Sequence, residues 1–520
     1  MPGWSTSPAA RQSGTRSPVR SLELLGLVIV SLAAVFWGFS VIEGKPGLQM
    51  EQYTLLLGFY GMASAMFVIP RFRADSSRLF DLPVFITLTA LLEFGLVPLY
   101  RFFFQPEEGR DAYLADPGLL TQALFYVVLG MIAFWVGSTF MRSRGDATRN
   151  AGSGTFAGAS SGENDSVLGW LGVIYLTSTA VRIYLLRSNL YAYNASIELH
   201  FQNLAAVQVL LVMTQFATFS LAIAAVESYW HPHDQKRKIL FYIIFSSECF
   251  WALLSGMKWS LIQDLLLVAL ISSVVQRRLR ARWMVAPLLM LILIYPFNNQ
   301  YRNLVRGEGM TVTSLDSAAR VGSLALVNAT EHTRSLSDWF GGGSVSSLNR
   351  LDLLRYVAGL VHYGPSADPL RTRDHWWMLP VYPFIPRLVW ASKPLEDFGQ
   401  KFSILLNADP NSCASPTYPG DAYLEFGVGG VVVCMLVLGI FCEWLTRLRN
   451  GTLSKRRLFL FAMMFLFTGD LEVDVFSFWT AIIKYLTILS LVAWFIYRQR
   501  RPSSRLLFRH RSLSAGGGST

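Results

Sequence analysis

The feature that most constrains this chain is a repeated apolar run of about 20 residues, the length that crosses the hydrocarbon core of a bilayer as an α-helix. In lipid every backbone N–H and C=O needs a partner within the protein, so runs of this kind fold as helices. Hydrophobic residues make up 52% of the 520 residues and charged residues 15%, whereas about a quarter of a typical soluble domain is charged. The sequence therefore predicts an all-α polytopic membrane protein.

The apolar runs predict about twelve transmembrane helices. The predicted spans lie at about 22–41, 52–70, 83–100, 119–141, 166–186, 203–229, 239–255, 259–276, a ninth ending near 297, 422–445, 458–468 and 478–497. The expected organisation is a disordered segment 1–20, helices 1–9 within 21–297, one large loop 298–420, helices 10–12 within 421–497, and a basic tail 498–520.

Charge in the short loops predicts the orientation of these helices. Lys and Arg gather after every second span, at 71–78, 142–149, 236–238, 277–282 and 447–457. Cytoplasmic loops carry this excess, so we expect both termini in the cytoplasm and the loop 298–420 outside it. The formal net charge of +11 is thereby explained by topology, and no nucleic-acid partner is expected.

The cysteines indicate neither a disulfide framework nor a zinc site. Cys249, Cys434 and Cys442 fall in apolar runs, and only Cys413 lies in a loop. No CxxC or Cys/His pair has the spacing of metal ligands. No metal or other cofactor is therefore expected.

Several cations occupy unexpected positions. Arg302 and Arg306 lie four residues apart directly after a predicted span, so on a continuing helix they share one face. Lys258 sits in the outward turn between two spans without an acidic neighbour, and Arg182 lies within a span, where a cation is costly and usually functional. Together they predict a cationic pocket for phosphate oxygens at the outer leaflet. Ordinary ion pairs are the alternative for any single arginine.

Residues 375–430 combine prolines, glycines and aromatic side chains at the highest density in the chain. Trp376, Trp377, Trp390 and Tyr423 suit either an interfacial aromatic belt or stacking on sugar rings. The candidate general bases are Glu425, Asp421 and His375. Helix capping is the alternative role for Asp421, and a structural role is the commoner one for a loop histidine.

A set of short motifs in this segment resembles the bacterial oligosaccharide repeat-unit polymerases, the Wzy-type polymerases of O-antigen and exopolysaccharide assembly. The motifs are Pro386-Arg387…Trp390…Lys393-Pro394, Ser415-Pro416 and Tyr423-x-x-Phe426-Gly427-x-x-Gly430. The turn Ser255-Gly256-x-Lys258, the pair Tyr301-Arg302 and the large outer loop extend the resemblance. Glu425 departs from it, since related sequences often carry Asn there.

The resemblance implies a GT-C-like glycosyltransferase that polymerises polyprenyl-diphosphate-linked oligosaccharides at the outer face of the bacterial inner membrane. It needs no nucleotide sugar and no metal, and it works with a flippase and a chain-length regulator of the same pathway. The lipid diphosphate is expected near Arg302 and Arg306, and the acceptor along 376–423. The full set of expected substrate-binding residues is Arg302, Arg306, Lys258, Arg387, Lys393, Arg350, Arg182, Tyr301, Trp376, Trp377, Trp390 and Tyr423.

Two other classes fit the architecture. One is an O-antigen-ligase-like enzyme or another polyprenyl-linked-sugar glycosyltransferase; an acidic pair in the first outer loop would favour the latter, and that loop offers only Glu43 and Glu51. The other is a flippase or transporter of lipid-linked oligosaccharides. Transporters carry repeated halves around a midplane site, and this chain shows no internal repeat and one disproportionate loop.

The topology predicts that a single cysteine at Ser347, in the middle of the loop 298–420, reacts with a membrane-impermeant maleimide added from outside the inner membrane when the native cysteines, Cys413 of the same loop included, have been replaced. The Arg-rich loops that flank this loop are expected to hold it there. Labelling in intact spheroplasts measures this. Reaction only after the membrane is permeabilised would reverse the orientation.

Overall fold

The computed structural model describes residues 49–74, 76–104, 117–146, 166–192, 204–276, 294, 296–331, 351–364, 370, 373–385, 389–390, 393, 398–407, 414–450 and 454–497. Within these ranges the regular structure is helical and no residue lies in a strand. The predicted all-α class is confirmed for this part of the chain.

Eight helical stretches in the described part are long and apolar enough to cross a membrane. They are α2 (Gln49–Ala74), the continuous run α3 (Leu82–Leu91), η3 (Leu92–Leu96) and α4 (Val97–Phe104), then α5 (Pro117–Asp146), α6 (Ser166–Arg187), α8 (Leu204–Trp230), α10 (Lys258–Gln276), α16 (Tyr418–Asn450) and α18 (Val475–Ile496). Each coincides with a predicted span, so the chain is a helical membrane protein. The first predicted span, at 22–41, and most of the ninth lie outside the described residues.

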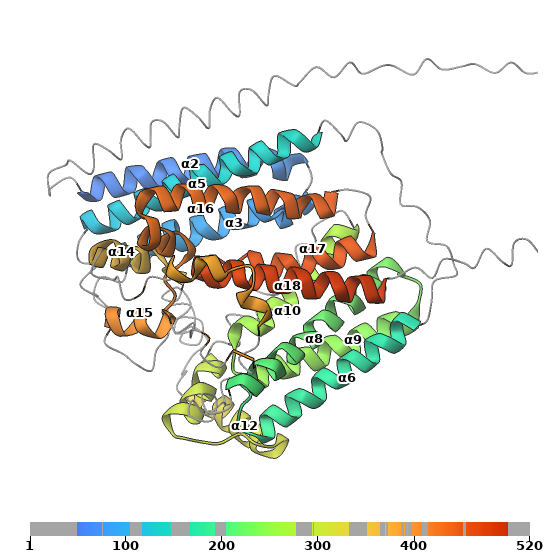
Figure 1. Ribbon diagram of the computed structural model, residues 1–520. Helices are drawn as coiled ribbons and strands as arrows, with labels where there is room; N and C mark the ends of the chain where they lie inside the picture. Colours follow the sequence, from blue (N-terminus) through green and yellow to red (C-terminus); the bar gives the residue numbers. More distant parts are fainter. Residues whose placement is uncertain are drawn as a thin grey trace, which may run out of the picture.

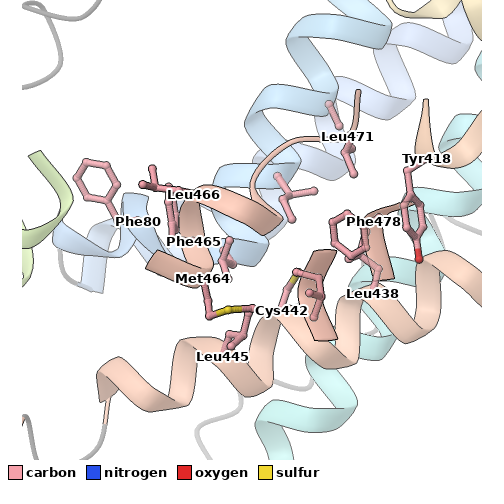
Figure 2. Close-up of a cluster of buried hydrophobic side chains, with 14 of the residues drawn as sticks. Phe80, Tyr418, Leu438, Cys442, Leu445, Met464, Phe465, Leu466, Leu471 and Phe478 are labelled. Atoms are coloured by element: carbon pink, nitrogen blue, oxygen red, sulfur yellow. The ribbon is translucent and has the colours of Figure 1, made fainter. Parts of the chain in front are cut away.

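The seventh and eleventh predicted spans are helical but fall short of these criteria: α9 (Gln235–Leu254) and α17 (Lys455–Thr468) are not among the eight candidates. The count of twelve spans remains a prediction. α17 is nevertheless central, because its side chains from Leu458 to Leu466 are all buried, as expected for a helix that is apolar on every side. Figure 2 shows Phe465 and Leu466 beside Phe80 in this core.

α5 and α16 pack along each other more extensively than any other two helices described (Figure 1). Glycines allow this close approach. A Cβ on Gly137 of α5 would lie 2.3 Å from the carbonyl oxygen of Leu436, and one on Gly439 of α16 would lie 2.0 Å from that of Phe134. Small residues at helix interfaces drive association in membranes, where apolar burial from water is absent.

Contacts between helix ends show which turns share one end of the bundle. Lys455, at the start of α17, donates to Glu227 (3.1 Å) and lies 2.8 Å from His231, both at the end of α8. Since α9 begins directly after α8, the α9–α10 turn at 255–257 and the α17–α18 turn at 469–474 lie together at the opposite end. We call this the loop end.

The described helices of the long loop gather at the loop end. They are η6 (Asn303–Gly307), α12 (Leu315–Glu331), α14 (Leu354–Tyr363), η8 (Arg373–Met378), η9 (Tyr382–Phe384) and α15 (Phe398–Asn407); Figure 1 shows α12, α14 and α15 there. The opposite end is closed by buried ion pairs, Arg449 with Asp81 and Arg237 with Glu227. The loop is therefore attached to one face of a bundle whose other face is held by charge pairs.

The glycine contacts predict that Gly137→Ala destabilises the protein by about 1–3 kcal/mol, because the added methyl group must push the backbone of α16 away. Thermal unfolding in detergent measures the loss. Gly172→Ala in α6 is the matched control: no atom lies within 4 Å of its Cβ position, so its melting temperature should equal or exceed that of the parent. Equal melting temperatures for both variants would contradict the close packing.

Candidate functional site

The first turns of α16 are broken at Gly427. This residue has φ 64° and ψ −155° inside an otherwise continuous helix, a backbone conformation open essentially to glycine alone. The chain folds closely over itself there: a Cβ added to Gly430 would lie only 2.3 Å from the carbonyl oxygen of Ala422, so no larger residue fits without a shift. The short segment before the break carries Asp421 and Glu425, one turn apart.

Beside this break Asp421 is within electrostatic range of two other carboxyl groups, Glu425 and Asp474. Asp421 is fully buried; its Oδ2 accepts a hydrogen bond from the N–H of Val475 (2.9 Å), and its Oδ1 is buried without a hydrogen-bond partner. Glu425 is 3% exposed. Both Asp474 and Glu425 act electrostatically on Asp421. Repulsion between buried carboxylates disfavours charging all of them together, so a site of this kind can accept a proton.

Asp474 also caps α18: its Oδ1 accepts from the N–H of Ser477 at 2.7 Å. Burial raises the pKa of Asp474, and the hydrogen bonds from Ser477 act in the opposite direction. The sequence offered capping of its own helix as an alternative role for Asp421, but Asp421 lies inside the first turn of α16, which begins at Tyr418, and its Oδ2 accepts from Val475, the first residue of α18. Asp421 instead holds the start of α16 to α18.

Aromatic side chains of the loop lie against this segment. Trp376 packs edge-on against Phe426, with ring centroids 5.1 Å apart, and Tyr423 stacks on Tyr126 at 4.9 Å. His375, next to Trp376, is half-buried, and Trp377 is 75% exposed. The structure thus brings the segment of His375 and Trp376 to the segment of Glu425 and Phe426.

Lys393 and Trp390 stabilise the loop itself. The Lys393 ammonium donates to the carbonyl oxygens of Tyr382 (2.7 Å) and Ile385 (3.1 Å) and lies 3.9 Å from the centroid of the Tyr382 ring. Trp390 packs edge-on against the same ring at 6.2 Å. Lys393 and Trp390 were expected to bind substrate; the contacts described here show that both also hold the fold of the loop.

Tyr301 and Arg302 meet the α9–α10 turn. The Tyr301 hydroxyl donates to the carbonyl oxygen of Leu254 (3.2 Å), and Arg302 Nε donates to that of Gly256 (2.9 Å). The helix continues through Tyr301 and Arg302, but residues 303–307 form a π-helical turn rather than an α-helical one, and Arg306 is exposed. The side chain of Lys258, together with Arg350 and Arg387, lies outside the described residues.

The residues expected to bind the donor and the acceptor pack in different hydrophobic clusters. Tyr301 and Leu304 pack with the ends of α6 and α9. Trp376 and Tyr423 pack on the main core of the bundle, which includes α5 and α16.

The cation within a span is paired, contrary to the interpretation of Arg182 as a lone charge. Its Nη1 and Nη2 donate to Oε1 (2.6 Å) and Oε2 (2.9 Å) of Glu248, which also accepts from the Tyr175 hydroxyl at 3.0 Å. Asp264 on α10 interacts electrostatically with both charges. Glu248 and Asp264 were missed, although an acid inside an apolar run is the signal that reveals such partners.

A second buried ion pair attaches the loop to the bundle. Arg101 of α4 lies 2.7 Å from Asp352, and both side chains are buried. Burial raises the pKa of Asp352, while the Arg101 charge acts to lower it. The N–H of Leu353 donates to the carbonyl oxygen of Glu93 (3.2 Å), which lies in the π-helical stretch η3, where the usual i→i−4 bonds are replaced. Asp352 was not identified from the sequence.

Within the described ranges no group of three or more His, Cys, Asp or Glu side chains is arranged to hold a metal ion.

A family model described as "Domain of unknown function (DUF8712)" matches residues 173–453, more than half of the chain. The matched region extends from α6 to just beyond α16, so it contains the Arg182–Glu248 pair, the long loop and the broken helix. No curated protein and no solved structure matches.

The bidentate pair predicts that Glu248→Leu alone destabilises the protein by about 3–5 kcal/mol, because it leaves a buried guanidinium without its partner. The double variant Arg182→Met with Glu248→Leu should recover a large part of the loss. Thermal unfolding of the single and double variants in detergent measures the coupling. If Arg182 served only to bind substrate, Arg182→Met would unfold at the parental temperature.

Proposed function

This chain belongs to the DUF8712 family, whose description names no activity. From the site itself we propose that the protein is a membrane glycosyltransferase. It would polymerise polyprenyl-diphosphate-linked oligosaccharides, as the Wzy-type polymerases do. One observation carries the proposal. Two buried carboxyl groups, Asp421 and Glu425, stand on a broken membrane helix beneath an aromatic segment of the loop. Buried acids beside an exposed aromatic residue suit proton transfer from a sugar hydroxyl.

In the proposed reaction an acceptor hydroxyl attacks the anomeric carbon of the donor saccharide. A new glycosidic bond forms, the bond from that carbon to the diphosphate breaks, and the diphosphate oxygen keeps the electron pair. Glu425 or Asp421 accepts the hydroxyl proton; the free Oδ1 of Asp421 and the position of Glu425 next to Phe426 support both roles. His375 remains the third candidate base. Because diphosphate leaves readily, positioning supplies much of the rate.

Cations near the α9–α10 turn would bind the leaving diphosphate. Arg302 is anchored to Gly256 through Nε, which holds its guanidinium beside the turn that contains Lys258, and Arg306 is exposed on the next turn. Guanidinium groups bind phosphate oxygens in a bidentate manner, and fixed cations stabilise the charge that develops on them. Arg387 completes the proposed set. The outer face of the bacterial inner membrane, with both chain termini in the cytoplasm, is the proposed location.

The direct test is extension of a purified lipid-diphosphate repeat unit by the purified protein, without nucleotide sugar and in the presence of EDTA. Glu425→Gln and Arg302→Ala should each abolish extension while the melting temperature is unchanged, and Arg302→Lys should restore it only partly, because an ammonium group lacks the bidentate fork. Glu443→Gln is the matched control. It removes a buried acid from the same helix, bonded to Ser138, near the opposite end.

Transport is the second candidate, favoured by the break at Gly427, because transporters build their sites on broken membrane helices. Liposomes separate the two: passage of the lipid across the bilayer without extension would exclude the enzyme. Cells separate the polymerase from a ligase. Loss of a polymerase leaves single lipid-linked repeat units at the outer leaflet, whereas loss of a ligase leaves full-length polymer on the lipid.

A further inference from the structure

The helix α12 lies at the level where the membrane helices end. Its small residues Ala318, Val321, Ala325 and Ala329 recur at helical spacing and are buried. The first three pack in one cluster with Leu185 and Leu186 of α6 and Trp251 and Leu254 of α9. The candidate span in α6 ends at Arg187, so α12 is held beside the ends of spanning helices and not above them in water.

A second apolar stripe on α12 is uncovered. Leu315, Ala319 and Leu326 are separated by four and seven residues, so they share one side of the helix, and all three are exposed; Leu315 is 57% and Leu326 53% exposed. The other exposed positions are mixed: Asp316, Arg320, Ser323 and Thr330 are polar, whereas Leu324 (38% exposed) and Val327 (47% exposed) are apolar. The helix thus presents one buried stripe and an exposed surface on which large apolar side chains are frequent.

The surroundings of α12 carry the marks of a membrane–water boundary. Tyr184 near the end of α6 is 58% exposed and Trp259 at the start of α10 is 45% exposed; Tyr and Trp concentrate at this boundary in membrane proteins. Arg187, Arg306 and Arg320 are exposed near the same level. Their positive charges complement the anionic headgroups of a bilayer.

We propose that α12 is an interfacial helix whose stripe Leu315–Ala319–Leu326 is inserted at the boundary between lipid headgroups and acyl chains. Helices with exposed apolar side chains bind bilayers in this way; the positive charge beside α12 comes from Arg187 and Arg306, because α12 itself carries Arg320 together with Asp316 and Glu331. The occupant of the stripe is lipid, and the first part of the loop 298–420 then lies on the membrane and is not a free aqueous loop. This inference stands independently of the reaction proposed above.

The test is site-directed spin labelling of the full chain in liposomes of phosphatidylethanolamine and phosphatidylglycerol. Cys249 and Cys413 are replaced by Ala, Cys434 and Cys442 stay buried in the core, and the nitroxide is attached to a cysteine at Leu326 or, as control, at the exposed polar position Ser323. The measured quantity is the collision rate of the nitroxide with each reagent. At Leu326 the nitroxide should collide more often with oxygen, which concentrates in the bilayer, than with a nickel chelate, which stays in water. The oxygen-to-nickel ratio should be several-fold higher there than at Ser323. Leu315→Cys is the second position if the first variant does not fold.

Two outcomes would overturn the proposal. Equal ratios at Leu326 and Ser323, with both labels open to the nickel chelate, would place α12 in water. If the label at Leu326 is inaccessible to both reagents and its spectrum is broadened by a second nitroxide nearby, a second copy of the chain covers the stripe.

Discussion

The cost of placing a charge or an open backbone group in hydrocarbon is the constraint on which the rest of this structure depends. Arg182 is matched by Glu248, Arg101 by Asp352, and Arg449 by Asp81. Each pair joins segments far apart in the chain. A buried pair adds little net stability but makes the loss of either partner severe, so these contacts specify which helix ends can meet.

The same constraint explains why the broken helix is informative. A helix inside a membrane can be interrupted only where the protein satisfies the groups that the break releases. Here Gly427 supplies the conformation, and the start of α16 is held by Tyr418 N–H bonded to the Leu471 carbonyl oxygen and by Asp421 bonded to Val475. The segment before the break carries Asp421, whose Oδ1 is buried without a protein hydrogen-bond partner; a group of this kind calls for an explanation, such as a functional role.

The loop and the bundle are joined by irregular helical turns. The π-helical stretch at 92–96 lies where Leu353 bonds the Glu93 carbonyl oxygen, and the one at 303–307 follows Arg302, which bonds Gly256. Such turns often occur at functional sites because they leave backbone groups free for other partners. The hydrogen bonds of Leu353 and Arg302 beside these turns attach the loop to the bundle at two places.

The sequence by itself determined the membrane class and the eight candidate spans, because hydrophobic length is a local property of the chain. The tertiary structure alone decided that Arg182 is paired, that Asp352 anchors the loop and that Lys393 bonds its own loop. These facts depend on which side chains meet across distant segments. Periodicity reports the face of a helix but not the partner that covers it, and in a membrane the partner decides whether a charge is a binding group or part of a pair.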